Sequence, residues 1–133
     1  MVEELRRWLL SSNLIPVKPA DFDVDFLDYK EAMSLQLSPG TIIDQYIGGD
    51  CNVEQSFSLV YRSMNTDKKK RESQIARLNA IGEWVNSQKV MPSLGENIIV
   101  NKIRCSSTAC ILDIDEKSTT YQIIFNMNYE KKE

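Results

Sequence analysis

The chain has 133 residues, of which 42% are hydrophobic and 26% charged, which is typical of one globular domain with a core of its own. Its formal net charge of −3 gives no overall field that would draw it onto DNA or an anionic membrane. We therefore expect no sequence-specific nucleic-acid binding. No stretch approaches the roughly 20 apolar residues that span a bilayer, so we also expect no membrane segment.

The opening residues, MVEELRRWLL, predict a short amphipathic helix within residues 1–12. Leu5, Trp8 and Leu9 recur at helical spacing and share one face. Acidic residues stand at the start, and the apolar part is short and interrupted, which does not fit a secretion signal. Pro16 prevents the helix from restarting after it has ended.

Residues 21–63 predict strands joined by short turns, which favours antiparallel neighbours. In Phe22–Tyr29 acidic and apolar residues alternate, as on a strand with one buried face. Met33–Leu37 alternates apolar residues with Ser34 and Gln36, and we expect a second strand there.

Two further strand signals follow along this region. Ile42–Ile47 is rich in apolar residues and fits either a strand or a turn of helix. Gly48-Gly49-Asp50 permits the positive φ angles that a tight reversal needs. Phe57–Arg62 alternates aromatic or apolar residues with polar ones, which predicts a strand.

The longest helical pattern covers residues 67–88, DKKKRESQIARLNAIGEWVNSQ. Ile75, Leu78, Ile81 and Val85 recur at steps of three and four residues, so they form one stripe of a helix. Burying these side chains contributes roughly 6–12 kcal/mol, which is comparable to the whole net stability of a small domain, about 5–15 kcal/mol. The stripe therefore has to pack on the strands that precede and follow it.

Residues 96–129 again predict strands. We expect one strand over Glu96–Arg104 and a turn at Ser106–Thr108 that returns the chain as a hairpin. The inward face of the returning strand is expected to carry three residues, Cys110, Leu112 and Ile114.

The last part of the chain carries its clearest alternation, over Thr119–Tyr129, after a turn at Asp115–Ser118. Residues 130–133 are charged and are expected to form a frayed tail. The order of elements predicts an α+β fold in a single domain, residues 1–133. One mixed or antiparallel β-sheet is expected, with the short N-terminal helix and the long central helix packed on it.

Three aspartates near the start raise the question of a metal site. Asp21, Asp23 and Asp25 begin like a calcium-binding loop, but the position that needs glycine is Phe26 and the closing glutamate is replaced by Ala32. The solvent face of a strand explains the three acids better. We therefore predict no metal ion at this site.

Cysteine chemistry is limited by the absence of histidine. Cys51, Cys105 and Cys110 form no CxxC motif, and a nucleophilic cysteine lacks its usual base. Cys105 and Cys110 flank a short connection and would be within disulfide reach in a hairpin, so reduced thiols and a pair both remain open. No Walker loop, GxGxxG or GxSxG motif is present, so we predict no catalytic site, no cofactor and no enzyme activity.

The start of the long helix is basic, with Lys68, Lys69, Lys70 and Arg71 in a row. Cations there oppose the helix dipole, at up to about 0.3–1 kcal/mol each at low salt. The row fits a solvated surface, a helix that begins nearer Ser73, or a contact with an acidic surface on a neighbouring subunit or partner.

Several weak motifs occur in an order that resembles a known family. They are Leu5-Arg6-Arg7-Trp8-Leu9, Asp25-Phe26-Leu27, Met33-Ser34-Leu35, Ile43 to Gly49 with Tyr46, Gln55-Ser56-Phe57 with Tyr61-Arg62, Trp84-Val85, Pro92-Ser93-Leu94, and Tyr121 to Phe125 with Tyr129. Together they resemble the minor capsid or tail terminator proteins of long non-contractile-tailed phages and prophages of Gram-positive bacteria. The chain departs from that pattern at Thr108-Ala109-Cys110, where the family has a glycine-leucine pair.

This resemblance implies a structural virion protein that is made in the host cytoplasm. Tail terminators form a homo-hexameric ring at the head-proximal end of the tail, stop polymerisation of the major tail tube protein and present a surface for head–tail joining. The implied partners are copies of the chain itself, the tube protein and the head completion or connector protein. A head completion protein at the same junction is the main alternative, and a small metal-binding protein or enzyme is a second one.

Within such a ring, three groups of residues are the candidate surfaces. Asp44, Tyr46 and Asp50 in the Ile42–Asp50 segment, together with the basic row Lys68–Arg71, are candidates for subunit or partner contact. Asp21, Asp23 and Asp25 are candidates for the lumen, because acids there would repel passing DNA.

Overall fold

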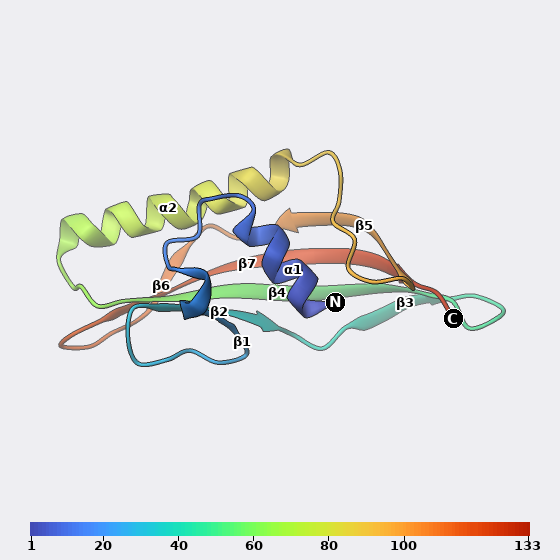
Figure 1. The fold of residues 1–133 in the computed structure, drawn as a ribbon, viewed down its shortest axis with the longest axis horizontal. Helices are drawn as coiled ribbons and strands as arrows, with labels where there is room; N and C mark the ends of the chain where they lie inside the picture. The colour runs from blue at the N-terminus through green and yellow to red at the C-terminus, as the bar shows by residue number, and fades with distance from the viewer.

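The computed structural model describes all residues 1–133 and has an α+β fold in which two α-helices pack on a seven-stranded mixed sheet (Figure 1). In chain order the elements are α1 (Val2–Leu10), the 3₁₀ turn η1 (Pro19–Asp21), β1 (Phe22–Val24), β2 (Ala32–Leu37), β3 (Thr41–Gln45), β4 (Cys51–Ser63), α2 (Lys68–Ser87), β5 (Ile98–Cys105), β6 (Cys110–Ile114) and β7 (Thr119–Lys131). The expected class and both helices are confirmed.

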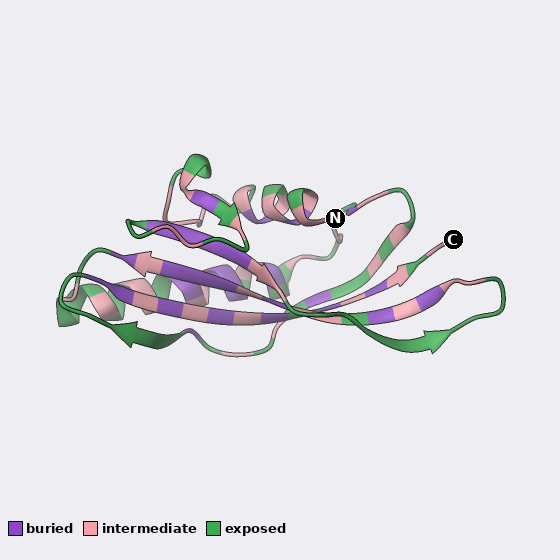
Figure 2. Cartoon of the chain, turned by 90° about the horizontal axis from the view of Figure 1, so that it is seen from below, coloured by how far each residue is buried: buried purple, intermediate pink, exposed green.

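The sheet is built around β4 and β7, which are 13 residues long each. They pair antiparallel over their whole length, from Cys51 opposite Lys131 to Ser63 opposite Thr119. Alternate residues point to opposite faces of a strand, so one face collects the apolar side chains. Figure 2 shows this alternation of burial along the long strands, and the buried rows include the stacked pair Phe57 and Phe125.

Each central strand is flanked by two shorter strands placed end to end. Along β4, β2 pairs with the second half and β3 with the first half; along β7, β5 pairs with the second half and β6 with the first. The expected β5–β6 hairpin is therefore wrong. The chain leaves β5, bulges at Ser106–Ala109 and continues along the same edge of β7 as β6.

Side-chain hydrogen bonds explain why the chain does not turn back at this point. The Ser106 hydroxyl donates to the Ile124 carbonyl, and the Ile124 N–H donates to the Ser107 hydroxyl, so the connection stays attached to β7. From α2, Asn79 accepts a hydrogen bond from the Ala109 N–H at 2.8 Å and Asn86 accepts one from the Cys105 N–H at 2.8 Å. These bonds replace the ladder that a hairpin would have supplied.

Both helices cover the apolar face of the sheet. α2 packs on β5 and β7 and buries Leu78, Ile81 and Val85, whereas Ile75 at the start of the expected stripe is half-buried. α1 lies next to β1, and its Trp8 ring meets the Trp84 ring of α2 at a centroid distance of 5.0 Å. Neither helix combines the length and apolar character that a membrane crossing requires.

Two expectations at the edges of the sheet are wrong. The strand expected over Phe22–Tyr29 stops at Val24, because Asp25 adopts a left-handed φ of 55°, and β1 pairs parallel to β2. The tail expected to fray from residue 130 is held instead. β7 runs on to Lys131, the Lys132 N–H donates to the Asn97 carbonyl at 2.7 Å, and the Glu133 N–H donates to a carboxylate oxygen of Asp50 at 3.0 Å.

Candidate assembly surfaces

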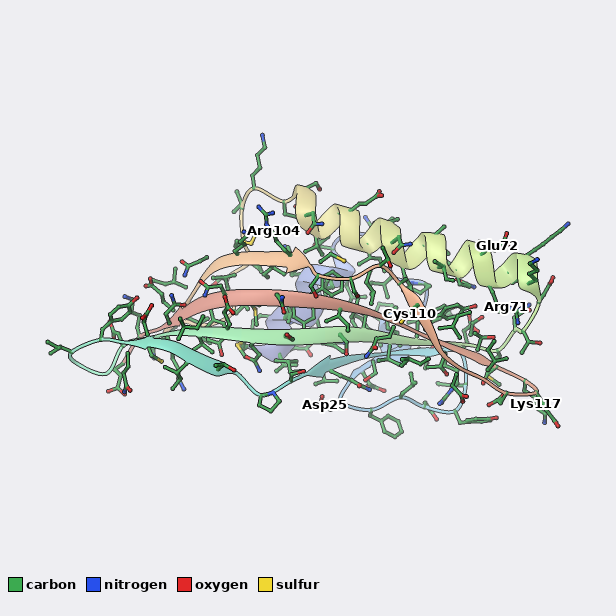
Figure 3. All side chains as sticks on the ribbon, turned by 180° about the vertical axis from the view of Figure 1, so that it is seen from behind. Asp25, Arg71, Glu72, Arg104, Cys110 and Lys117 are labelled. Atoms are coloured by element: carbon green, nitrogen blue, oxygen red, sulfur yellow. The ribbon has the colours of Figure 1, made fainter.

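The basic row lies at the first turn of α2. The helix begins at Lys68, so the alternative start near Ser73 is wrong; Asp67 caps it by accepting a hydrogen bond from the Lys69 N–H at 3.3 Å. Lys68, Lys69 and Lys70 are exposed, and no cation of the row takes part in a salt bridge. Figure 3 shows Arg71 at the same end of the molecule as Lys117 of the β6–β7 turn. The three lysines are thus solvated at one end of the elongated molecule, and Arg71 beside them is half-buried.

The three aspartates near the start do not share one face. Asp21 lies in the 3₁₀ turn and forms a salt bridge with Lys30 at 2.7 Å, and this partner raises the pKa of Lys30. Asp23 is exposed on β1, opposite Ser34 of β2. Asp25 is exposed beyond the end of the strand, where its N–H donates to the Leu35 carbonyl. Of these three aspartates, only Asp23 and Asp25 are exposed and without a salt bridge.

The β3–β4 hairpin projects from the opposite end of the molecule (Figure 1). Gly48 and Gly49, with φ angles of 100° and 95°, close its turn, and the Tyr46 N–H donates to the Asp50 carbonyl at 2.8 Å. The turn leaves Ile47 fully exposed.

The three candidate residues of this hairpin have different roles. Asp50 serves the fold, because its carboxylate accepts the Glu133 N–H and faces the Lys132 ammonium at 3.4 Å, and these contacts lower the pKa of Asp50. Asp44 and Tyr46 are exposed. All of β3 is exposed, so this hairpin presents both an open strand edge and apolar side chains to solvent.

β6 is a second exposed strand, and sequence reasoning missed it. Cys110, Leu112 and Ile114 were expected to face inward, but all five residues of β6 are exposed. The cause lies in α2, whose first turns read KKKRESQ and offer no apolar surface before Ile75. That polar run was the available signal that nothing would cover the strand.

A groove of about 480 Å³ lies between α2 and the Ser106–Ala109 bulge. Its lining is mostly polar, but Asn79 and Asn86 are already used to hold the backbone of the bulge. Cys105 is the one hydrophobic residue of the lining, and it lies next to Gly82. The groove is thus a by-product of how the bulge is anchored.

The three cysteines are free thiols. Cys51 is buried. Cys105 is half-buried and donates to the Ser107 carbonyl, and burial raises the pKa of its thiol. Cys110 is exposed on β6. The structure brings together no cluster of three or more histidine, cysteine, aspartate or glutamate side chains that could hold a metal ion.

Comparison with known proteins gives one kind of match. No protein-family model matches the chain, and no curated protein matches it in sequence. Among solved structures, the fold is similar to that of a chain in the structure described as the virion of a native gene transfer agent particle, with a TM-score of 0.59. The match covers 94% of this chain and 91% of that chain at 11% sequence identity, so it shows a shared fold.

Proposed function

We propose that the chain is a structural protein of a phage-like virion and, within it, the tail terminator. In this role a hexameric ring of the chain caps the head-proximal end of the tail tube and forms the surface for head–tail joining. The observation that carries the proposal is the near full-length likeness of fold to a chain of a gene transfer agent virion. The order of the sequence motifs from Leu5 to Tyr129 supports the more specific role.

In the proposed mechanism, the ring occupies the surface to which the next tube subunit would otherwise add. One face of the ring matches the last ring of tube subunits, and the other face does not match the tube protein, so no further tube subunit can add. An elongated subunit with separate surfaces at its two ends suits this role, because head-to-tail contacts close into a ring when the rotation between copies allows it.

The charged surfaces are assigned to different neighbours. We place the unpaired cations at the start of α2, Lys68 to Arg71, against an acidic surface of the tube protein or head connector. Exposed Asp23 and Asp25 remain candidates for the lumen, where a carboxylate repels passing DNA. The Asp23→Asn/Asp25→Asn variant should fold as the parent does; a large loss of solubility or stability would contradict the lumen assignment.

The test is capping of tail tubes in vitro. Purified tube protein should polymerise without limit alone, and addition of this chain should stop growth and leave a ring at one tube end in electron micrographs. Tubes that grow to the same lengths with and without the chain would contradict the proposal. Binding to the head connector without binding to the tube would favour the head completion alternative.

A further inference from the structure

β3 and β6 form a matched pair of open edge strands. Each has five residues, TIIDQ and CILDI, and each pairs on one side only. Each carries an irregularity at the same place, between Ile42 and Asp44 in β3 and between Ile111 and Asp113 in β6. The backbone N–H and C=O groups on the outer side of both strands have no strand to bond to.

Both edges lack the two residues that protect an open edge most directly, since neither lysine nor proline occurs in these strands. Their short length, one irregularity and one aspartate each give only partial protection. Apolar side chains stand there instead, with exposed fractions of 58% for Ile42, 48% for Ile43, 51% for Leu112 and 48% for Ile114. Two edges of this kind on one molecule indicate surfaces that are covered in its working state.

The positions of the two strands suit a contact between copies. β3 flanks β4 at one end of the molecule and β6 flanks β7 at the other end (Figure 1), so the two strands lie at diagonally opposite corners of the sheet. Because β4 and β7 are antiparallel and each edge strand is antiparallel to its inner neighbour, β3 and β6 run in opposite directions. A second copy in the same orientation, shifted along the strands, therefore brings its β6 beside β3 as an antiparallel neighbour.

We propose that β3 of one copy pairs with β6 of the next, so that the sheets of neighbouring subunits join into one. This contact deepens the proposed function and rests on it for closure into a ring. The occupant is a second copy of this chain, because the two edges match in length, in irregularity and in apolar character. The contact is head-to-tail, so each added copy covers one open edge of the assembly and leaves one new open edge of the same kind.

Charge excludes one register of this contact. Asp44 and Asp113 lie opposite Asn52 and Thr120, so they share the face of the sheet away from the helices. Like charges directly opposite each other are destabilising, which disfavours Asp44 facing Asp113. Two registers avoid this while keeping residues of the same face opposite each other. One places Asp44 opposite Cys110 and Thr41 opposite Asp113, and the other places Ile42 opposite Ile114 and Gln45 opposite Ile111.

Both registers can be tested with the exposed native thiol of Cys110. Directly opposed residues on antiparallel strands have Cα atoms about 4.5–5.5 Å apart, within disulfide reach. The Asp44→Cys variant, oxidised and run on a non-reducing gel, should lose its monomer band to a ladder of dimers, trimers and larger species. Tyr46→Cys places a thiol opposite Cys110 in the second register, so failure of both variants to cross-link at the highest soluble concentration overturns the proposal.

Matched controls separate this contact from others. Asp44→Cys/Cys110→Ser should remain monomeric, and dimers from it would indicate that β3 meets β3. Dimers from the unmodified chain would indicate that β6 meets β6. Either result contradicts head-to-tail pairing, as would an equal ladder from Val90→Cys, which places a thiol on an exposed residue outside both strands.

The outcome is independent of tail capping. A ladder from Asp44→Cys with no effect on tube growth supports the contact and contradicts the terminator role. Capped tubes without cross-links in the bound ring support the terminator role and contradict this contact.

Discussion

Gly82 lies where α2 packs against the end of β5. A Cβ atom placed there would lie 2.7 Å from the Cys105 Sγ atom and 3.2 Å from the Ile123 Cδ1 atom. Alanine improves helix propensity by about 0.5–1 kcal/mol, whereas overpacking a filled site costs about 1–3 kcal/mol. We therefore expect Gly82→Ala to lower the free energy of unfolding, measured by urea denaturation.

A second variant shows whether the contact with Cys105 causes the loss of stability in Gly82→Ala. In Cys105→Ala the Sγ atom is absent, so the same Gly82→Ala change should cost less than it does in the parent chain. Equal costs in the two backgrounds would contradict the steric account.

Asp115 fixes the turn between β6 and β7. Its carboxylate accepts hydrogen bonds from the Lys117 N–H at 2.8 Å and the Ser118 N–H at 2.7 Å, and these bonds lower the pKa of Asp115. A lowered pKa means that the folded chain favours the carboxylate. Its contribution to stability is therefore present above the ordinary value of 3.8 and is lost as the pH falls through the lower folded value.

We expect the Asp115 carboxyl to titrate below 3.8, as followed by NMR. Asp115→Asn should lose less stability than the parent over the same acid range, because the amide cannot titrate. A midpoint at or above 3.8 would show that the turn does not stabilise the charged form.

At the scale of the element, α2 is anchored by its second half. Leu78 is completely buried, and Leu78→Ala should lower the free energy of unfolding by about 2–5 kcal/mol. Ile75 is half-buried near the polar start of the helix, so Ile75→Ala should cost clearly less. Urea denaturation of the two variants measures the difference, and equal losses would contradict the packing described for this helix.

Local patterns predicted most elements because they reflect which face is buried. The stripe Leu78, Ile81, Val85 and the alternation in Thr119–Tyr129 depend on apolar residues meeting one core, and both elements form as expected. The β5–β6 connection was mistaken for a hairpin because its course depends on Asn79 and Asn86, far away in sequence. Such long-range hydrogen bonds leave no periodic signal in the segment that they hold.

The candidate surfaces were predicted unevenly for a related reason. The Ile42–Asp50 segment was identified from its glycines and apolar residues, and the structure exposes it. β6 has a similar composition, but alternation alone cannot show whether another element packs on its apolar side chains. Whether β6 is covered depends on the polar first turns of α2, a helix that precedes β6 in the chain and is separated from it by β5.

At the scale of the whole molecule, the charges at the start of α2 can be separated from folding. Lys68, Lys69 and Lys70 are exposed and unpaired, and acids at a helix start are favourable by about 0.3–1 kcal/mol each at low salt. Reversing the three lysines to glutamate should leave thermal stability unchanged or slightly higher. The variant should nevertheless fail to cap tail tubes.

The matched control reverses three exposed lysines elsewhere, Lys18, Lys89 and Lys102. It changes the net charge equally and should retain capping. If both variants cap as the parent does, the basic row is plain solvated surface and has no part in the contact with a partner.

The position of β7 in the sheet has a consequence for synthesis. β7 is the last strand along the chain, yet it lies between β4 and the β5–β6 edge, and it pairs residues as distant as Cys51 and Lys131. Until Thr119–Lys131 has left the ribosome, β4 has no partner on that side and the central β4–β7 pair of the sheet cannot form. Contacts between such distant segments form slowly. Nascent or prematurely terminated chains therefore cannot act as subunits, and entry into an assembly is reserved for molecules translated through their final strand.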